Sequence, residues 1–129
     1  MKLPPYAALL GASIGSEDGT AAPVLAMPFG NDVTGRPGFV HGGALAGLLE
    51  LAAITALEHA LAAEARGEAG FKPVNVTVDF MRGGREKLTR AQGHVSRLGS
   101  RIANVEAVAW QDDRDRPVAA ARMNFLISG

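Results

Sequence analysis

The residues best suited to chemistry in this sequence are His41-Gly42-Gly43 and Glu50. Most helices begin with Ser, Thr, Asp or Asn, whose side-chain oxygen accepts a free backbone N–H group. A helix that begins at or just after His41 with two glycines leaves its first N–H groups open, at the positive end of the helix dipole. Such donors stabilise the oxyanion that develops on an ester or thioester carbonyl. Glycines also permit close packing against a strand, so ligand contact and packing both remain interpretations of this start.

Glu50 stands in an apolar stretch without a neighbouring positive charge. It is the only ionisable residue between His41 and Glu58, and no Lys or Arg lies three or four residues away. A carboxylate in such surroundings is costly to bury. One interpretation is a general base or nucleophile whose pKa is raised by the apolar neighbourhood. The other is a structural acid that pairs with a distant arginine, for example across a subunit contact.

Spacing along the helix limits how Gly42 and Glu50 can cooperate. The two residues are eight positions apart, which is about 12 Å along one helix. They cannot both contact one carbonyl within a single chain. If both act on it, a dimer must bring the helix start of one protomer beside the middle of its partner's helix.

The remaining polar residues give weaker signals. Arginines near predicted strand ends are suited to the phosphates of a carrier such as coenzyme A at a subunit boundary, or they are ordinary solvated turn charges. These arginines are Arg82, Arg85, Arg97 and Arg101. The segment 112–117 reads as a polar hairpin turn, since its spacing does not match a calcium loop. No histidine pair has metal-ligand spacing and no serine occupies a nucleophile elbow, so we expect no metal.

The elements that must position these residues follow from hydrophobic periodicity. A strand is predicted over Ala22 to Phe29, a loop over Gly30 to Val40, and a helix from His41 to about Arg66 that ends at Gly67 or Gly70. The first half of this helix is apolar around nearly its whole circumference, which predicts burial on all sides.

Strands dominate the rest of the chain. Val74 to Met81 alternates as a half-buried strand does, and further strands are predicted over Lys87 to Arg97, Ile102 to Trp110 and Val118 to Ile127. In the last of these, alternate residues from Ala119 to Ile127 form one wholly apolar face. This order indicates an α+β fold in which an antiparallel meander curves around one helix. A sheet from one short chain leaves an open edge and flank, so we expect a symmetric dimer.

Composition bounds the class of protein. The chain has 129 residues, which predicts one domain over 1–129, with 13 Lys+Arg, 13 Asp+Glu and no cysteine. The missing cysteines exclude thiolate catalysis and disulfides and fit a reducing, cytoplasmic location. Zero net charge argues against a nucleic-acid surface. The apolar stretch Gly42 to Leu57 is shorter than a membrane span, and the first residues do not resemble a signal peptide, so no membrane association is expected.

Several of these motifs together resemble a known family. His41-Gly42-Gly43 with an acid seven positions after the second glycine is similar to the hotdog-fold acyl-CoA thioesterases, particularly the PaaI-like group. The segments 76–82 (VTVDFMR) and 96–101 (SRLGSR) are also similar to that group. The resemblance covers about Val24 to Ile127, nearly the whole chain.

The resemblance implies a sheet wrapped around a central helix, a homodimer with two shared active sites, and often a dimer of dimers. The Gly42 N–H would polarise the thioester carbonyl, Glu50 of the other protomer would act as general base or nucleophile, and His41 would shape the site. No cofactor is implied, since coenzyme A is part of the substrate. Substrate-binding residues would be Gly43, Asn31, Ile54, Phe80, Arg82, Arg97 and Arg101.

Two positions depart from the family pattern. Many relatives have Asn or Gln where this chain has Gly35, and Ser or Thr where it has Pro73; Asn31 or Arg36 are candidate substitutes for the first. The leading hypothesis is an acyl-CoA thioesterase. The second is a non-catalytic acyl-CoA binding or sensing module on the same fold. A hydratase is disfavoured, because the Asp and His pair of that chemistry has no counterpart.

Overall fold

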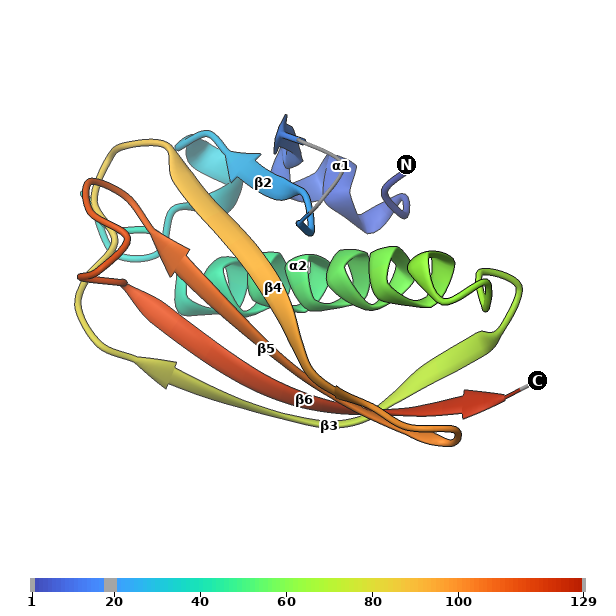
Figure 1. The fold of residues 1–129 in the computed structure, drawn as a ribbon. Helices are drawn as coiled ribbons and strands as arrows, with labels where there is room; N and C mark the ends of the chain where they lie inside the picture. Colours follow the sequence, from blue (N-terminus) through green and yellow to red (C-terminus); the bar gives the residue numbers. More distant parts are fainter. Residues whose placement is uncertain (1, 18–20, 129) are drawn as a thin grey trace.

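The computed structural model describes residues 2–17 and 21–128 as a six-stranded antiparallel sheet that curves around one long helix (Figure 1). The predicted α+β class is therefore confirmed. The elements in chain order are α1 (Tyr6–Leu10), β1 (Ser13–Ser16), β2 (Val24–Met27), the 3-10 turn η1 (Asn31–Val33), α2 (Gly42–Ala63), β3 (Gly70–Phe80), β4 (Thr89–Leu98), β5 (Ile102–Trp110) and β6 (Ala119–Ser128). The sequence analysis missed α1 and β1, both of which are too short for a clear periodicity.

The strand order differs from the predicted meander. It is β1-β2-β4-β5-β6-β3, so β3 pairs with the last strand instead of with β4. Only β4, β5 and β6 form a meander. The chain leaves β3 near the start of α2 and crosses to β4 on the other side of β5 and β6 (Figure 1). This crossing makes β3 one edge of the sheet.

Small residues bring α2 directly onto the sheet. The predicted apolar face of β6, from Ala119 to Ile127, is buried, as are the alternate residues of β5 that face the helix. Gly93 of β4 is the point of closest approach, because a Cβ there would lie 2.5 Å from the Ala52 carbonyl oxygen and 2.7 Å from the Ala56 Cβ. The sheet thus holds the helix by contact with its backbone.

The helix ends earlier than expected and without a glycine. Its last residue is Ala63, and Ala65 adopts a left-handed φ of 58°. The Arg66 N–H donates to the Leu61 carbonyl at 2.7 Å and the Ala65 N–H donates to the Ala62 carbonyl at 3.1 Å, which is the Schellman pattern. The Arg66 guanidinium then donates to the carbonyl oxygens of Gly99 and Ser100. The prediction that Gly67 or Gly70 ends the helix is therefore wrong.

Burial around α2 is also incomplete, in contrast to the prediction. The sheet covers one side, and Tyr6 of α1 covers another, with its hydroxyl oxygen 2.5 Å from where a Cβ of Gly47 would lie. Ala46, Glu50 and Ile54, four residues apart, are only half-buried. We call these three residues the open stripe of α2. By length and composition this 22-residue helix is able to cross a membrane, but 67% of its apolar window is buried in the fold, as in a core helix.

Strand β3 is more exposed than its alternating pattern predicted. Val74, Val76 and Phe80 are 57%, 45% and 57% exposed, and only Val78 of this apolar row packs against the core. The reason is the strand order, since α2 packs on β4, β5 and β6 and does not extend over the β3 edge. The edge strand β3 therefore exposes a row of apolar side chains.

Candidate active site

Two backbone hydrogen bonds fix the chain where it enters α2. The Val40 N–H donates to the Gly84 carbonyl at 2.9 Å, and the His41 N–H donates to the Val33 carbonyl at 2.7 Å. The start of the helix is therefore held between η1 and the loop that follows β3. His41 itself is extended, with φ −63° and ψ 137°, as an N-cap residue normally is.

The side chain of His41 caps the helix. Its Nδ1 accepts the Gly43 N–H at 2.8 Å, so the expectation of an entirely uncapped start is wrong. A Cβ on residue 43 would lie only 2.9 Å from this Nδ1, so the capping hydrogen bond itself requires a glycine at this position. The Gly42 N–H has no partner among residues 2–17 and 21–128. One open donor remains at the start of the helix.

The cap also defines the state of the imidazole ring. A neutral histidine carries one N–H, and the nitrogen that accepts a hydrogen bond cannot be the one that carries the proton. Because Nδ1 accepts from Gly43, the proton of neutral His41 is on Nε2. The ring therefore presents a second N–H donor beside the start of α2.

A cavity of about 460 Å³ opens at the start of α2. It brings together four of the predicted site residues, His41, Gly42, Phe80 and Arg82. Leu45 and the Phe80 ring give it apolar walls, and the ring lies 3.4 Å from where a Cβ of Gly42 would be. Asn31 does not line this cavity; it is an exposed residue of η1 whose carbonyl accepts the Thr34 N–H.

Glu50 and Ile54 lie further along α2, outside the cavity. Both belong to the open stripe, on the flank of the helix that neither the sheet nor α1 covers. In the described part of the chain Glu50 forms no hydrogen bond or ion pair. A single chain thus leaves Glu50 and Gly42 apart, as the eight-residue spacing predicted.

The two departures from the family pattern lie in different places. Gly35 packs on the helix start, because a Cβ there would come within 3.0 Å of the His41 Cα. A side chain at this position would require the loop to shift by a few tenths of an ångström. Pro73 lies opposite Phe125, near the start of β3 and just before an irregularity in its pairing with β6. It is remote from Gly42 within one chain.

The arginines do not form one cluster. Arg82 and Arg85 follow β3, near the helix start, whereas Arg97 and Arg101 flank the β4–β5 turn near the helix end, where Arg66 binds Gly99. Sequence reasoning considered Arg36 only as a substitute at Gly35. In the structure Arg36 and Arg85 both stack on the Phe39 ring. No sequence signal reveals this contact, because it joins two loops.

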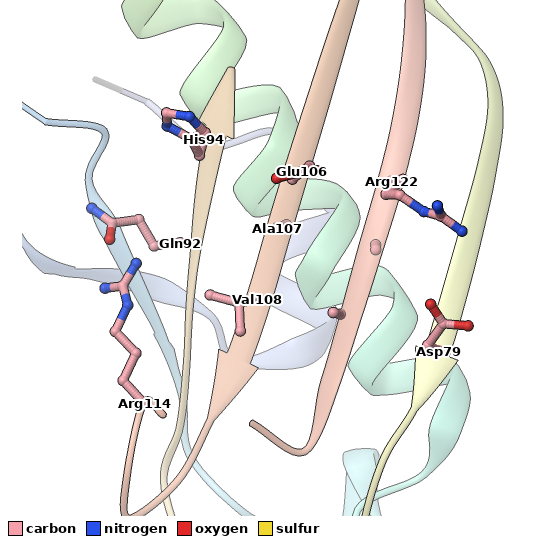
Figure 2. Close-up of a pocket in the computed structure, with 10 residues that line it drawn as sticks. Asp79, Gln92, His94, Glu106, Ala107, Val108, Arg114 and Arg122 are labelled. Carbon is pink, nitrogen blue, oxygen red and sulfur yellow. The ribbon is translucent and has the colours of Figure 1, made fainter. Parts of the chain in front are cut away.

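A second cavity of similar size lies elsewhere, on the face of the sheet opposite α2 (Figure 2). It has about 470 Å³ and its charged lining combines both signs on adjacent strands, including His94, Glu106 and Arg122. None of the predicted site residues lines it. Among the described residues no group of His, Asp and Glu is arranged to hold a metal ion. The start of α2 is therefore the candidate site.

Comparisons with known proteins agree with this fold. A family model described as the thioesterase superfamily matches residues 37–118. A protein from Chromobacterium violaceum is 33% identical, with 95% of this chain and 82% of that chain covered and a TM-score of 0.75. No curated protein sequence matches the chain.

Two more distant solved structures share the architecture. A phenylacetic acid degradation-related protein from Ralstonia eutropha is 23% identical over 98% of this chain and 92% of that chain, with a TM-score of 0.77. A thioesterase from Haemophilus influenzae is 16% identical over 95% of this chain and 81% of that chain, also with a TM-score of 0.77. The helix wrapped by an antiparallel sheet is the hotdog fold.

Proposed function

The chain belongs to the thioesterase superfamily, and this membership indicates thioester hydrolysis as its general activity. We propose that it hydrolyses an acyl-CoA thioester to a free acid and coenzyme A. The observation that carries this proposal is the unpartnered Gly42 N–H, which faces a partly apolar cavity at the positive end of α2. A thioester carbonyl in this cavity would receive that hydrogen bond as its oxygen becomes an oxyanion.

The second group of the reaction is Glu50 of the partner protomer. The apolar row on the β3 edge favours burial against an identical edge, which extends the sheet through a two-fold axis. Gly42 lies beside Phe80, at the end of β3, so antiparallel pairing of two β3 strands makes the two α2 helices antiparallel as well. The open stripe of each helix then faces the helix start of the other protomer.

The reaction is balanced with these groups alone. As general base, the Glu50 carboxylate takes a proton from water while the water oxygen bonds to the carbonyl carbon. The tetrahedral oxyanion accepts the Gly42 N–H, the C–S bond breaks, and the departing thiolate takes the proton back from Glu50. As nucleophile, Glu50 would instead form an anhydride that water then cleaves.

The remaining predicted contacts follow from the same dimer. A two-fold axis at β3 brings the β4–β5 turn of the partner, with Arg97 and Arg101, toward the end of the molecule where Arg82 lies. We propose that these arginines bind the carrier from both protomers and that Ile54 contacts the acyl group. Asn31 and Gly43 would contribute only from the rim, since the Gly43 N–H is already bonded to His41.

Thiol release from short, medium and aromatic acyl-CoA thioesters tests the activity, and mixed dimers test the shared site. Glu50→Gln and Gly42→Pro are each expected to be inactive alone. If the site is shared, a mixed dimer contains one intact site, so random mixing recovers about a quarter of the wild-type rate. If no activity is recovered although mass spectrometry shows mixed dimers, Gly42 and Glu50 of different protomers do not form one site and the proposed mechanism is wrong.

A second candidate function is supported by Gly35. The family's water-orienting amide at this position is absent, and Gly35 packs closely on the start of α2. A binding or sensing module predicts measurable affinity for an acyl-CoA without turnover. Calorimetry with the same thioesters, followed by analysis of the mixture for free acid, separates this function from hydrolysis.

A further inference from the structure

We propose that Arg36 and Arg85, stacked on the ring of Phe39, form a binding site for the phosphate groups at the nucleotide end of the acyl carrier. The proposal rests on the proposed thioesterase function. It adds two arginines and an aromatic residue to the site, and it identifies a phosphorylated nucleotide as the feature that this chain recognises.

The geometry of the three side chains favours an anion. The guanidinium carbon of Arg36 lies 4.0 Å from the centre of the Phe39 ring, and that of Arg85 lies 4.4 Å from the same point. Stacking leaves the N–H edges of a guanidinium free for bidentate contacts to phosphate. Since both cations lie against one ring, separate phosphate groups of one nucleotide can contact one cation each.

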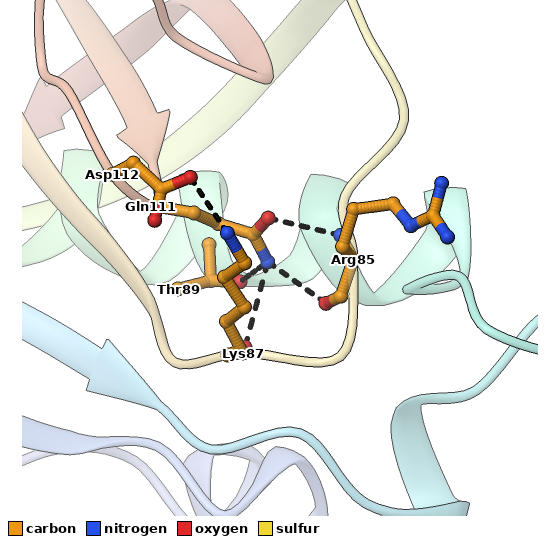
Figure 3. Close-up of polar contacts among 5 residues, drawn as sticks. All are labelled: Arg85, Lys87, Thr89, Gln111 and Asp112. Atoms are coloured by element: carbon orange, nitrogen blue, oxygen red, sulfur yellow. Dashed lines mark hydrogen bonds and ion pairs between the residues drawn. The ribbon is translucent and has the colours of Figure 1, made fainter.

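The backbone of Arg85 is fixed by the side chain of Gln111 (Figure 3). The Arg85 N–H donates to Oε1 of Gln111 at 2.9 Å, and Nε2 of Gln111 donates to the Arg85 carbonyl at 3.0 Å. The Arg85 guanidinium points away from this pair of bonds (Figure 3). Gly83 closes the other side of the cluster, because a Cβ there would lie 2.7 Å from the Phe39 ring. The loop therefore holds the cation in place before any ligand arrives.

Neither stacked guanidinium is neutralised within the described residues. Neither Arg36 nor Arg85 forms an ion pair there. Two nearby acids are engaged elsewhere: Asp112 binds Lys87 at 2.7 Å, and Oδ1 of Asp113 accepts the Asp115 N–H. The Glu86 carboxylate lies 3.8 Å from where a Cβ of Gly38 would be and forms no ion pair with either arginine. Two like charges against one ring repel each other, and bound phosphate groups reduce that repulsion.

The cluster lies where a carrier must pass. Arg36 and Phe39 line the cavity at the start of α2, and Arg85 lines an adjoining cavity of about 370 Å³, with Arg82 lining both. The carrier of a thioester bound at the Gly42 N–H would thus leave the site past these arginines. Coenzyme A carries three phosphate groups at its far end, whereas phosphopantetheine on a carrier protein carries only one, as a diester.

The experiment compares one acyl group on three carriers: coenzyme A, a carrier protein with phosphopantetheine, and N-acetylcysteamine, which has no phosphate. Loss of one exposed arginine is expected to raise KM for the acyl-CoA roughly three- to tenfold. In the double variant Arg36→Gln/Arg85→Gln we therefore expect this KM to rise about tenfold or more. We expect kcat, and KM for the N-acetylcysteamine thioester, to stay unchanged. Arg122→Gln, on the opposite face of the sheet, is the matched control for the loss of one charge.

Further variants separate a role in binding from a role in folding. Phe39→Leu removes the stacking surface and should raise KM for the acyl-CoA but not KM for the N-acetylcysteamine thioester. Arg85→Lys keeps the charge but lacks the two parallel N–H donors of a guanidinium, so its affinity for the acyl-CoA should lie between those of wild type and Arg85→Gln. Unchanged KM in the double variant, or an equal rise for N-acetylcysteamine, would overturn the proposal. If the double variant raises KM for the carrier-protein thioester as much as KM for the acyl-CoA, the two arginines do not recognise the nucleotide.

A direct binding measurement keeps the two proposals distinct. Adenosine 3′,5′-bisphosphate, titrated calorimetrically into the wild-type protein, should bind, and the double variant should bind it at least tenfold more weakly. If no thioester is hydrolysed but this difference is found, the phosphate site stands and the proposed hydrolysis fails. If hydrolysis is found and the variants bind the bisphosphate equally, the phosphate site fails.

Discussion

The imidazole Nδ1 of His41 accepts the backbone N–H of Gly43 at 2.8 Å. This hydrogen bond takes one of the free donors of α2 and leaves the preceding one, that of Gly42, open. The histidine thus has two separable effects: it stabilises the helix start, and it determines which N–H group a ligand can reach.

Substitution at His41 separates these effects. His41→Ala removes the cap and should lower the free energy of unfolding by about 1 kcal/mol. His41→Asn supplies an oxygen that accepts the same N–H and should restore that stability. If the ring also contributes its Nε2–H to the site, kcat falls in both variants. Denaturant unfolding and kcat, measured on the same preparations, check the prediction; equal stability of the Ala and Asn variants would contradict it.

Gly42 offers a direct test of its backbone donor. Proline is tolerated at the first position of a helix, and the extended conformation of His41 is one that can precede it, so Gly42→Pro should remove the N–H and keep the helix. We expect kcat to fall about 100- to 1000-fold, as for loss of one oxyanion donor. Gly42→Ala keeps the N–H beside the same Phe80 ring and is the steric control. Similar activity of the two variants would exclude the donor role.

Glu50 and Glu58 form a matched pair on one helix. They lie eight residues apart on one row of half-buried residues, but only Glu50 is assigned to the site, whereas Glu58 lies near the end of the helix. Glu50→Gln should lower kcat about 100-fold or more, as for loss of a general base, with little change in KM. Glu58→Gln should leave kcat near the wild-type value. A rate that survives Glu50→Gln would refute the proposed mechanism.

Burial raises the pKa of the Glu58 carboxyl above its ordinary value. The folded state therefore binds a proton at Glu58 more strongly than the unfolded state does, and this favours folding at low pH and disfavours it once the carboxyl ionises. Glu58→Gln should be more stable than wild type near neutral pH. The difference should shrink as the pH falls through the pKa of this carboxyl in the folded state. Thermal unfolding of both proteins across this range measures it; a difference independent of pH would oppose the interpretation.

The end of α2 offers a stabilising change. Ala65 occupies the left-handed position of a Schellman motif with φ 58°, where glycine has no Cβ to clash. Ala65→Gly should raise the free energy of unfolding by about 0.5–1 kcal/mol. Ala62→Gly, inside the helix, should lower it by a similar amount. Urea unfolding distinguishes the two variants.

The sequence was a good guide where one element determines the pattern. The helix start at His41, the apolar face of β6 and the separation of Gly42 from Glu50 all depend on local periodicity and spacing, and the structure agrees with each. The family resemblance located the same start and the same fold.

The failures arise where two distant elements meet. The exposure of Val76 depends on β3 pairing with β6, which no local pattern encodes. The cap on Gly43 is a local exception, since it depends on the ring orientation of His41 and histidine is not among the usual capping residues. The contact of Arg36 and Arg85 with Phe39 depends on two loops that the fold brings together. Such contacts follow from tertiary structure alone.

The position of β3 has a consequence for the order of assembly during synthesis. Because β3 pairs, among the described residues, only with β6, which follows it in sequence by about forty residues, a nascent protein that lacks β6 has no ordered β3 edge. This pairing is among the most non-local in the sheet, so it closes late. In the proposed dimer, protomers would therefore associate only after β6 has been synthesised and has paired with β3, and chains truncated before Ala119 should be unable to form mixed dimers with intact chains.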